Sequence, residues 1–234
     1  MQIFYSTEIK GNICRLDKAE SRHCLRVLRL AAGSRIKVVD GSGNLYEGFI
    51  SNPDLLGCEI TVTDVIRNFE QRKYRLHIAI SPLKNAERFE WFIEKCVEIG
   101  IDEITPLICR NTEKPGIKPD RINNIIVSAM KQSIKAYRPK LNKSVDFSDF
   151  IIFTLPGLKM ISTCLNSIDK SKIDQIYTRG QDATILIGPE GDFTEDEVDE
   201  AILGGYKPVH LGTSRLRTET AGIAACHSIY FINQ

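Results

Sequence analysis

Apolar runs and helical stripes alternate along the C-terminal part of the chain. The run Ala183–Ile187 is rich in β-branched residues and is followed at once by Gly188, which predicts a buried strand that ends in a tight loop. Thr194, with Glu197 three residues later, has the pattern of a capping box, and Gly204 marks where the predicted helix ends. The apolar stripe of this helix consists of Val198, Ala201 and Ile202. The order is therefore strand, loop, helix.

The same order occurs once more before the C-terminus. Val209–Leu211 predicts a short strand, Gly212 opens the loop after it, and Thr218 is a candidate N-cap of a final helix. The apolar side of that helix contains Ile223, Ala224 and Ile229, with Tyr230 or Phe231. Loops after strands of an α/β sheet are where ligands bind, and glycines there let the backbone approach a ligand. Both loops are candidate binding loops, although the glycines and Pro189 could also serve only to make turns.

Strands and helices also alternate between residue 71 and this segment. Strands are predicted at Tyr74–Ile80, Glu103–Cys109 and Leu158–Thr163, and helices at Asn85–Ile99 and from Pro119 onward. Asp149–Thr154 fits either a helix or a strand, and Asn166–Gln181 is expected to be a polar loop. This alternation predicts an α/β fold, with a mostly parallel sheet covered by helices on both faces.

The N-terminal residues have a different, β-rich pattern. Short β-branched or aromatic runs separated by turn residues predict strands at Gln2–Tyr5, Arg35–Val39, Leu45–Ile50 and Cys58–Thr63. One helix is expected, from Lys18 to Leu30. The strands suggest a small β-barrel. A polar, charged stretch over residues 66–75 predicts a linker, which gives domains 1–70 and 71–234.

Composition excludes several classes of protein. Hydrophobic residues make up 42% and charged residues 26% of the 234, which favours neither disorder nor a membrane protein. No apolar run is long enough to span a bilayer and the N-terminus lacks a secretory signal, so we expect a cytoplasmic protein with no membrane partner. The seven cysteines are scattered and never form a CxxC pair, so we expect reduced thiols and no metal site.

Basic residues gather in two segments although the net charge is only +1. Between Lys10 and Lys37 there are eight basic residues and two acids, and the run from Lys131 to Lys143 contains no acid. Either run could be an ordinary solvated face or a phosphate-binding surface for RNA.

Two C-terminal motifs, Ile187-Gly-Pro-Glu-Gly-Asp-Phe193 and Leu211-Gly-Thr-Ser-Arg-Leu-Arg-Thr-Glu-Thr-Ala-Gly222, together resemble the SPOUT class of RNA methyltransferases. Within that class they are similar to the RsmE family, the bacterial 16S ribosomal RNA (uracil-N3)-methyltransferases. His23-Cys-Leu-Arg-Val-Leu-Arg29 resembles the N-terminal signature of that family. The second motif departs from the family at Thr213-Ser214-Arg215, so Arg217, Glu219 and Thr220 are preferred to Arg215 as functional residues.

The resemblance implies an N-terminal PUA-like RNA-binding barrel and a C-terminal SPOUT domain with a trefoil knot. It also implies an S-adenosyl-L-methionine cofactor, ribosomal RNA or the small ribosomal subunit as substrate, and a homodimer. The cofactor-binding residues that it implies are Leu186, Ile187, Gly188, Pro189, Glu190, Gly191, Leu211, Gly212, Leu216, Arg217, Thr220 and Ala221. The RNA-binding candidates, from the basic runs and the family motifs, are Arg22, His23, Arg26, Arg29, Lys84, Lys131, Lys135 and Arg138.

Arg217 and Glu219 are the candidate catalytic residues. Methylation at N3 of uracil requires loss of the N3 proton, and a guanidinium can stabilise the anionic base while a carboxylate accepts the proton or orients the guanidinium. Alternatively, the two side chains form only an ion pair at the start of the last helix. Two other functions stay open: a ribose 2'-O-methyltransferase of the same fold, and an RNA-binding protein without catalytic activity.

Overall fold

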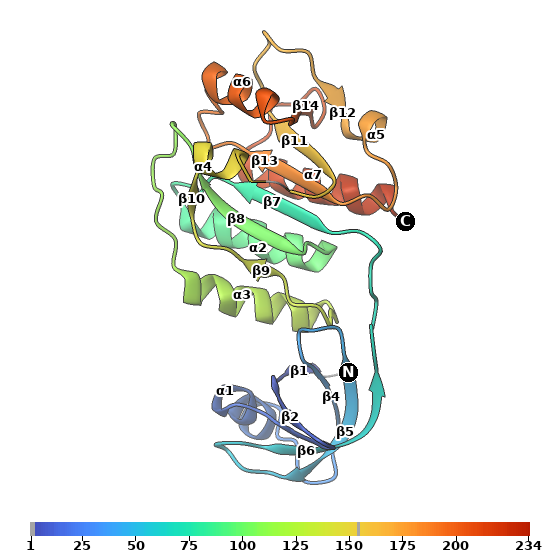
Figure 1. Cartoon of the computed structure of the whole chain (residues 1–234). Coiled ribbons are helices and arrows are strands. Elements are labelled where there is room, and N and C mark those ends of the chain that lie inside the picture. The colour runs from blue at the N-terminus through green and yellow to red at the C-terminus, as the bar shows by residue number, and fades with distance from the viewer. Residues whose placement is uncertain (1–2, 154) are drawn as a thin grey trace. The chain divides into compact units, whose positions relative to one another are not determined.

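The computed structural model describes residues 3–153 and 155–234. Contacts divide the chain into two compact units, one made of residues up to Gln71 together with Val127–Arg138, the other of Arg72–Ile126 and Pro139–Gln234 (Figure 1). The sequence predicts domains 1–70 and 71–234. In the structure the segment Val127–Arg138 belongs to the first unit, whereas the predicted division places it in the second domain.

The first unit is built on a curled sheet. In the described residues the strand order is β1-β4-β5-β6-β3-β2, and all pairs are antiparallel except β1 with β4. Irregular pairing of β5 with β6 near Gly48 and Ile50 accompanies the curl. The bounds are β1 Ile3–Tyr5, β2 Glu8–Lys10, β3 Ile13–Arg15, β4 Arg35–Val39, β5 Leu45–Asn52 and β6 Glu59–Ile66. Gln2, in the predicted first strand, lies outside the described residues.

The predicted helix Lys18–Leu30 is shorter and less regular in the structure. Helix α1 covers Lys18–Arg22 and continues as a π-helical turn, His23–Val27, in which the amide of Leu28 donates to the carbonyl of His23 at 3.0 Å. Arg29 has a φ of 55°, a left-handed conformation that ends the helix. The sequence prediction was therefore right about the helix but wrong about its end and its hydrogen bonding.

The second unit contains a parallel sheet. Its strand order is β10-β8-β7-β13-β11-β14-β12, with β9 beside β8, and every pair between described strands is parallel (Figure 1). The strands are β7 Leu76–Ile80, β8 Glu103–Ile108, β9 Lys140–Leu141, β10 Val145–Asp146, β11 Leu158–Ser162, β12 Ser171–Lys172, β13 Ala183–Ile187 and β14 Lys207–His210. The helices are α2 Ala86–Ile99, α4 Phe147–Ile151, α5 Ile173–Ile176, α6 Glu195–Leu203 and α7 Thr218–Ile232, together with the first part of α3 Pro119–Gln132, whose residues from Val127 onward belong to the first unit.

Helices cover both faces of this sheet, as the sequence predicts. On one face α4 and α6 pack on Ala79, Ile161 and Leu186, which belong to one buried cluster with Phe150 and Val198. On the other face α2 and α7 pack together on β7 and β13. Both strands are buried along their whole length because each lies between two other strands and under helices.

Several sequence predictions for this unit are confirmed and others are wrong. Strand Ala183–Ile187 and the capping box of Thr194 with Glu197 are found as predicted. Thr218 is the first residue of α7 and not its N-cap, which is Arg217. The predicted loop Asn166–Gln181 contains the short elements β12 and α5. Thr154 lies outside the described residues, and the segment before it forms α4.

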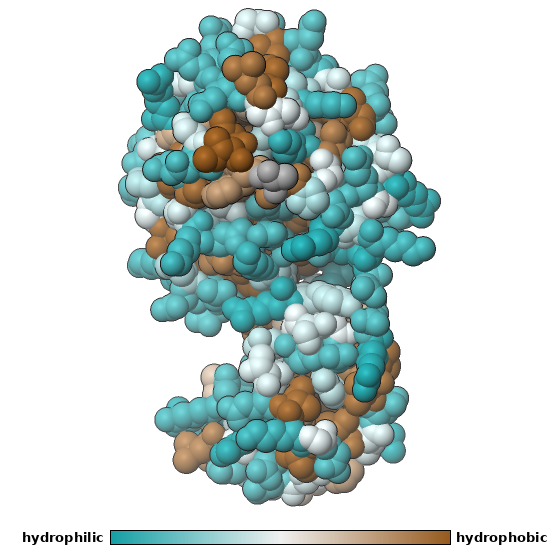
Figure 2. Space-filling model, in the orientation of Figure 1, coloured by the Kyte–Doolittle hydropathy of each residue, from teal (hydrophilic) through white to brown (hydrophobic). Residues whose placement is uncertain are grey.

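Hydrophilic residues cover most of the face shown in Figure 2, and hydrophobic patches interrupt them. In the second unit the large apolar side chains with the most exposure include Leu203 at 89%, Ile152 at 75% and Phe231 at 68%.

Candidate functional site

Three neighbouring strands end together at one edge of the parallel sheet. Ile187 of β13, Ser162 of β11 and Val209 of β14 lie side by side in register. Because the strands are parallel, the loops that follow them leave from the same edge. The sequence predicts binding loops after β13 and β14, and the structure adds the loop after β11, which lies between them.

A cavity of about 330 Å³ opens where these loops meet. The start of α7 and one residue of α2 complete its wall. The lining residues are Arg88, Ser162, Cys164, Ile187, Gly188, Pro189, Glu190, Gly191, Asp192, Arg215, Leu216, Arg217, Thr218, Glu219 and Ala221. Most of these residues lie in loops. The charged side chains come from Arg88, from α7 and from the loops.

Asp192 joins the loop after β13 to the loop after β11. Its Oδ2 accepts hydrogen bonds from the Thr163 hydroxyl at 3.0 Å and from the Cys164 amide at 2.6 Å. Its Oδ1 accepts from the Phe193 amide at 2.8 Å. The φ of Asp192 is 62°, which a short side chain that bonds to nearby backbone tolerates better than most. The carboxylate therefore fixes the shape of the cavity wall.

Two further loops brace the Gly188–Asp192 segment from the β7 and β8 side. The amide of Lys84 donates to Oε1 of Glu190 at 3.1 Å. The side-chain amide of Asn111 donates to the carbonyls of Gly191 and Asp192 at 3.3 and 3.1 Å. Backbone hydrogen-bonding groups of this loop are thus held in place before any ligand is present.

Gly188 is required by close packing. A Cβ atom at this position would lie 3.1 Å from the ring and from the amide nitrogen of Phe193, a side chain that is only 2% exposed. At Gly191 a Cβ would lie 3.3 Å from the Cβ of the exposed Asn111. The added methyl group of an alanine at either position would therefore contact Phe193 or Asn111 of the protein itself.

Glu219 and Arg217 both lie at the start of α7, but they do not pair. The carboxylate of Glu219 is 7% exposed, and its Oε1 lies 3.8 Å from Nε of Arg88 on α2. Among the residues that the structure describes, the guanidinium groups of Arg215 and Arg217 make no ion pair. The alternative of an Arg217–Glu219 ion pair is therefore wrong, while an orienting role of Glu219 toward Arg217 has no direct contact behind it in the described residues and stays a prediction.

The structure brings only part of the predicted cofactor set to this cavity. Ile187, Gly188, Pro189, Glu190, Gly191, Leu216, Arg217 and Ala221 line it. Leu186 is fully buried on the α4 and α6 side of the sheet, and Thr220 is exposed in the first turn of α7. Leu211 and Gly212 line a different hollow of about 290 Å³, together with Lys172, His210 and Phe231.

Sequence reasoning missed Arg88, Ser162, Cys164, Asp192 and Thr218 as lining residues, and it set aside Arg215, which also lines the cavity. Ser162 and Cys164 belong to a stretch whose strand was predicted but whose place in the sheet was not. Asp192 stands directly after the glycine motif, and that position was the one available signal. Arg88 lies near the start of α2. Only the tertiary structure shows that its side chain faces Glu219 of α7.

The predicted RNA-binding residues differ in how free their charges are. The side chains of Arg22, His23, Arg26 and Arg29 are exposed around the π-helical turn. By contrast, Nζ of Lys131 lies 2.5 Å from Glu20, Nζ of Lys135 lies 3.4 Å from Glu70, and Nζ of Lys84 lies 2.8 Å from Glu113. The guanidinium of Arg138 lies over the ring of Tyr5, 5.9 Å from its centroid.

Neither a metal centre nor a membrane-spanning helix is found in the described part of the chain. Within residues 3–153 and 155–234, no three His, Cys, Asp or Glu side chains are grouped so that they could hold a metal ion. No helix in the same ranges has the length and apolar character needed to cross a bilayer.

Comparisons with known proteins point to one family. The RNA methyltransferase domain family matches residues 70–230, and the RNA methyltransferase PUA domain family matches residues 16–63. A ribosomal RNA small subunit methyltransferase E from Mesomycoplasma hyopneumoniae is 30% identical over 168 residues, which are 69% of this chain and 72% of that protein.

Solved structures of related proteins resemble this chain over nearly its whole length. The crystal structure of a probable rRNA-methyltransferase from Porphyromonas gingivalis is 38% identical with a TM-score of 0.93, covering 100% of this chain and 98% of that one. A ribosomal RNA small subunit methyltransferase E from Neisseria gonorrhoeae, bound to S-adenosyl methionine, is 25% identical with a TM-score of 0.88, covering 99% and 97%. The chain belongs to the ribosomal RNA small subunit methyltransferase E family.

Proposed function

We propose that this enzyme transfers a methyl group from S-adenosyl-L-methionine to N3 of a uridine in the 16S RNA of the small ribosomal subunit. The observation that carries the proposal is the cavity at the ends of β13, β11 and β14, which is lined by some residues from each of the two motifs that resemble the family. The crystal structure of the Neisseria gonorrhoeae relative, which contains the methyl donor, supports the choice of cofactor.

The residues around the cavity fit this cofactor. Ile187, Leu216 and Ala221 provide apolar surface for an adenine ring, and the backbone of Gly188–Gly191 provides hydrogen-bonding groups for its polar edges. Leu211 and Gly212, which the resemblance also implies, line the neighbouring hollow and would contact the donor only at its margin. When bound, the cofactor supplies an electrophilic methyl group.

The chain's own residues prepare the uracil for that methyl group. N3 becomes a nucleophile only when it loses its proton, and in this proposal the carboxylate of Glu219, which lines the cavity, accepts that proton. Arg88, 3.8 Å away, balances the charge of the carboxylate before the transfer. The guanidinium of Arg217 lines the same cavity without an acidic partner in the described chain, so it is free to stabilise the negative charge on O2 or O4 of the base.

The remaining parts of the proposal concern the wider molecule. Residues 1–70 form a PUA-like module that binds RNA through Arg22, His23, Arg26 and Arg29. Residues 71–234 form a knotted SPOUT catalytic domain. A homodimer is supported by α7, where the large apolar side chain of Phe231 is 68% exposed near the end of the helix. A ribosomal RNA substrate places the enzyme in the cytoplasm.

Methyl transfer from labelled S-adenosyl-L-methionine to unmodified small ribosomal subunits tests this proposal. The labelled RNA is digested to nucleosides, and the account predicts 3-methyluridine as the labelled product. Label in a 2'-O-methylated nucleoside, or no transfer by protein that binds the donor, would refute it.

A further inference from the structure

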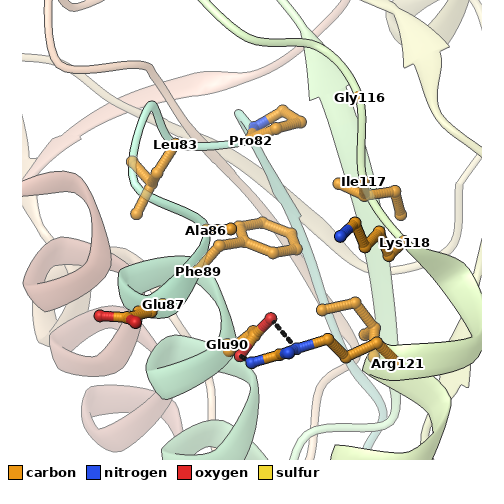
Figure 3. A pocket seen from close by; sticks show the side chains of 11 residues that line it. Pro82, Leu83, Ala86, Glu87, Phe89, Glu90, Gly116, Ile117, Lys118 and Arg121 are labelled. Carbon is orange, nitrogen blue, oxygen red and sulfur yellow. Dashed lines mark hydrogen bonds and ion pairs between the residues drawn. The ribbon is translucent and has the colours of Figure 1, made fainter.

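A second cavity, of about 230 Å³, lies between the start of α2 and the loop that precedes α3 (Figure 3). It shares no lining residue with the cavity described above. Its walls include Pro82, Leu83, Phe89, Ile117, Lys118 and Arg121. Neither the predicted cofactor set nor the proposed catalytic groups use it.

Its position along the sheet edge connects it to the cofactor loop. The two loops that form it follow β7, which is next to β13 in the sheet, and β8, which is on the other side of β7. Both loops are bonded to the Gly188–Asp192 segment, through the amide of Lys84 and through the side chain of Asn111. The two cavities are therefore neighbours at the carboxyl ends of one parallel sheet.

The chemistry of the cavity suits a flat ring with polar edges. Phe89 and Leu83 provide an apolar wall, and both are less than 5% exposed. Figure 3 shows Ile117 and Lys118 on the opposite side, with the ammonium of Lys118 directed toward Phe89. At the floor, Arg121 and Glu90 neutralise each other through contacts of 2.5 and 2.7 Å.

Lys118 and Glu87 are the two charged lining residues of this site that no ion pair balances among the described residues. Among the residues that the structure describes, the ammonium of Lys118 makes no ion pair, whereas Arg121 is held by Glu90. A nucleotide satisfies such a site, because its base fills the space between apolar walls while a carbonyl oxygen or phosphate accepts from a lysine. A purely apolar ligand would leave the ammonium without an acceptor.

We propose that this cavity binds the base of a single-stranded RNA nucleotide next to the target uridine, and so helps to select the substrate. The inference rests on the proposed function, since it takes the RNA as the substrate. It assigns to Pro82, Leu83 and Phe89 and to the Gly116–Arg121 segment a role in recognising RNA that is separate from donor binding and from methyl transfer.

Three variants test the inference in the full-length enzyme. Ile117→Trp fills the cavity and Lys118→Ala removes its free positive charge, whereas Lys114→Ala removes the same charge from the same loop outside the cavity. We expect the first two to raise KM for small-subunit RNA about tenfold, the scale of one lost base contact. The Lys114→Ala control should stay near the wild-type value, and all three should keep the wild-type affinity for S-adenosyl-L-methionine.

A photoreactive benzoylphenylalanine at Ile117 locates the nucleotide. After irradiation with the RNA, we expect crosslinks at a nucleotide adjacent to the methylated uridine. Normal KM values for Ile117→Trp and Lys118→Ala, or a KM rise as large for Lys114→Ala, would overturn the inference, as would crosslinks far from the uridine. Failure of the proposed function is distinct, because wild-type enzyme would then transfer no methyl group to RNA or would yield a methylated nucleoside other than 3-methyluridine.

Discussion

Replacing Glu219 by glutamine removes one negative charge from the cavity and keeps the shape of the side chain. If Glu219 accepts the N3 proton, turnover should fall by at least about 100-fold, the lower end of what a general base contributes. If its role is only structural, the loss should appear in stability and not in turnover.

The structure sets the size of the stability effect. Two unit charges about 4 Å apart attract by about 4 kcal/mol at an effective dielectric constant of about 20. Arg88 is 42% exposed, however, so solvent screens its pairing with Glu219 and the net value falls to about 1 kcal/mol. In a chain of this length that loss lowers the melting temperature by about 2–4 °C.

Single-turnover methyl transfer at saturating donor, with thermal melts of the same samples, measures both effects. Glu195→Gln is the matched control, since it removes a carboxylate from the first turn of α6, outside the cavity. Arg88→Gln completes a double-mutant cycle and shows how much of the effect passes through the ion pair. Turnover of Glu219→Gln within about threefold of wild type would refute the assignment of Glu219 as the proton acceptor.

Four further predictions concern other parts of the second unit. Arg217→Ala should reduce turnover at least ~100-fold while donor affinity and melting temperature stay unchanged; near-normal turnover in the same assay would leave this guanidinium without a catalytic role. Asp192→Ala removes the acceptor that joins two loops, so calorimetry should show weaker donor binding and melts a loss of about 1–3 kcal/mol; an unchanged affinity would mean that the loops hold their shape without it. Gly222→Ala places a Cβ 2.5 Å from the ring of Phe92 and should cost about 1–3 kcal/mol in urea unfolding, whereas a stabilised variant would show that the two helices can separate freely. Burial lowers the pKa of His77 to about 4 from its ordinary 6.5, so between these pH values the unfolded chain binds a proton that the folded chain does not. The free energy of unfolding should therefore fall by about 3 kcal/mol as the pH drops from about 6.5 to about 4. His77→Gln should abolish this dependence in melts across that range, and an unchanged dependence would show that other groups cause it.

Local patterns were enough to predict the elements around the site. Ala183–Ile187 is continuous, β-branched and closed by glycine, and the structure has it as β13 with the same bounds. The capping box at Thr194 and Gly204, the glycine that ends α6, depend on neighbouring residues alone, so they too could be predicted. The two binding loops followed from those strands.

Residues whose position depends on tertiary contacts could not be predicted. Arg88 reaches Glu219 only because α2 and α7 pack side by side, and Cys164 reaches Asp192 only because β11 lies between β13 and β14. The motif at Leu211 and Gly212 suggested a single cofactor loop, but its first residues turn toward a separate hollow. Sequence spacing gives the order of such residues along the chain but does not show which cavity each of them lines.

Primer extension across the small-subunit RNA, before and after incubation with enzyme and S-adenosyl-L-methionine, tests the central claim most directly. A methyl group on N3 removes the donor that a uridine uses in base pairing, so reverse transcriptase should stop at one enzyme-dependent position, and mass spectrometry of the isolated nucleoside should identify 3-methyluridine. A methylated RNA that gives full-length extension and a 2'-O-methylated nucleoside would contradict the account.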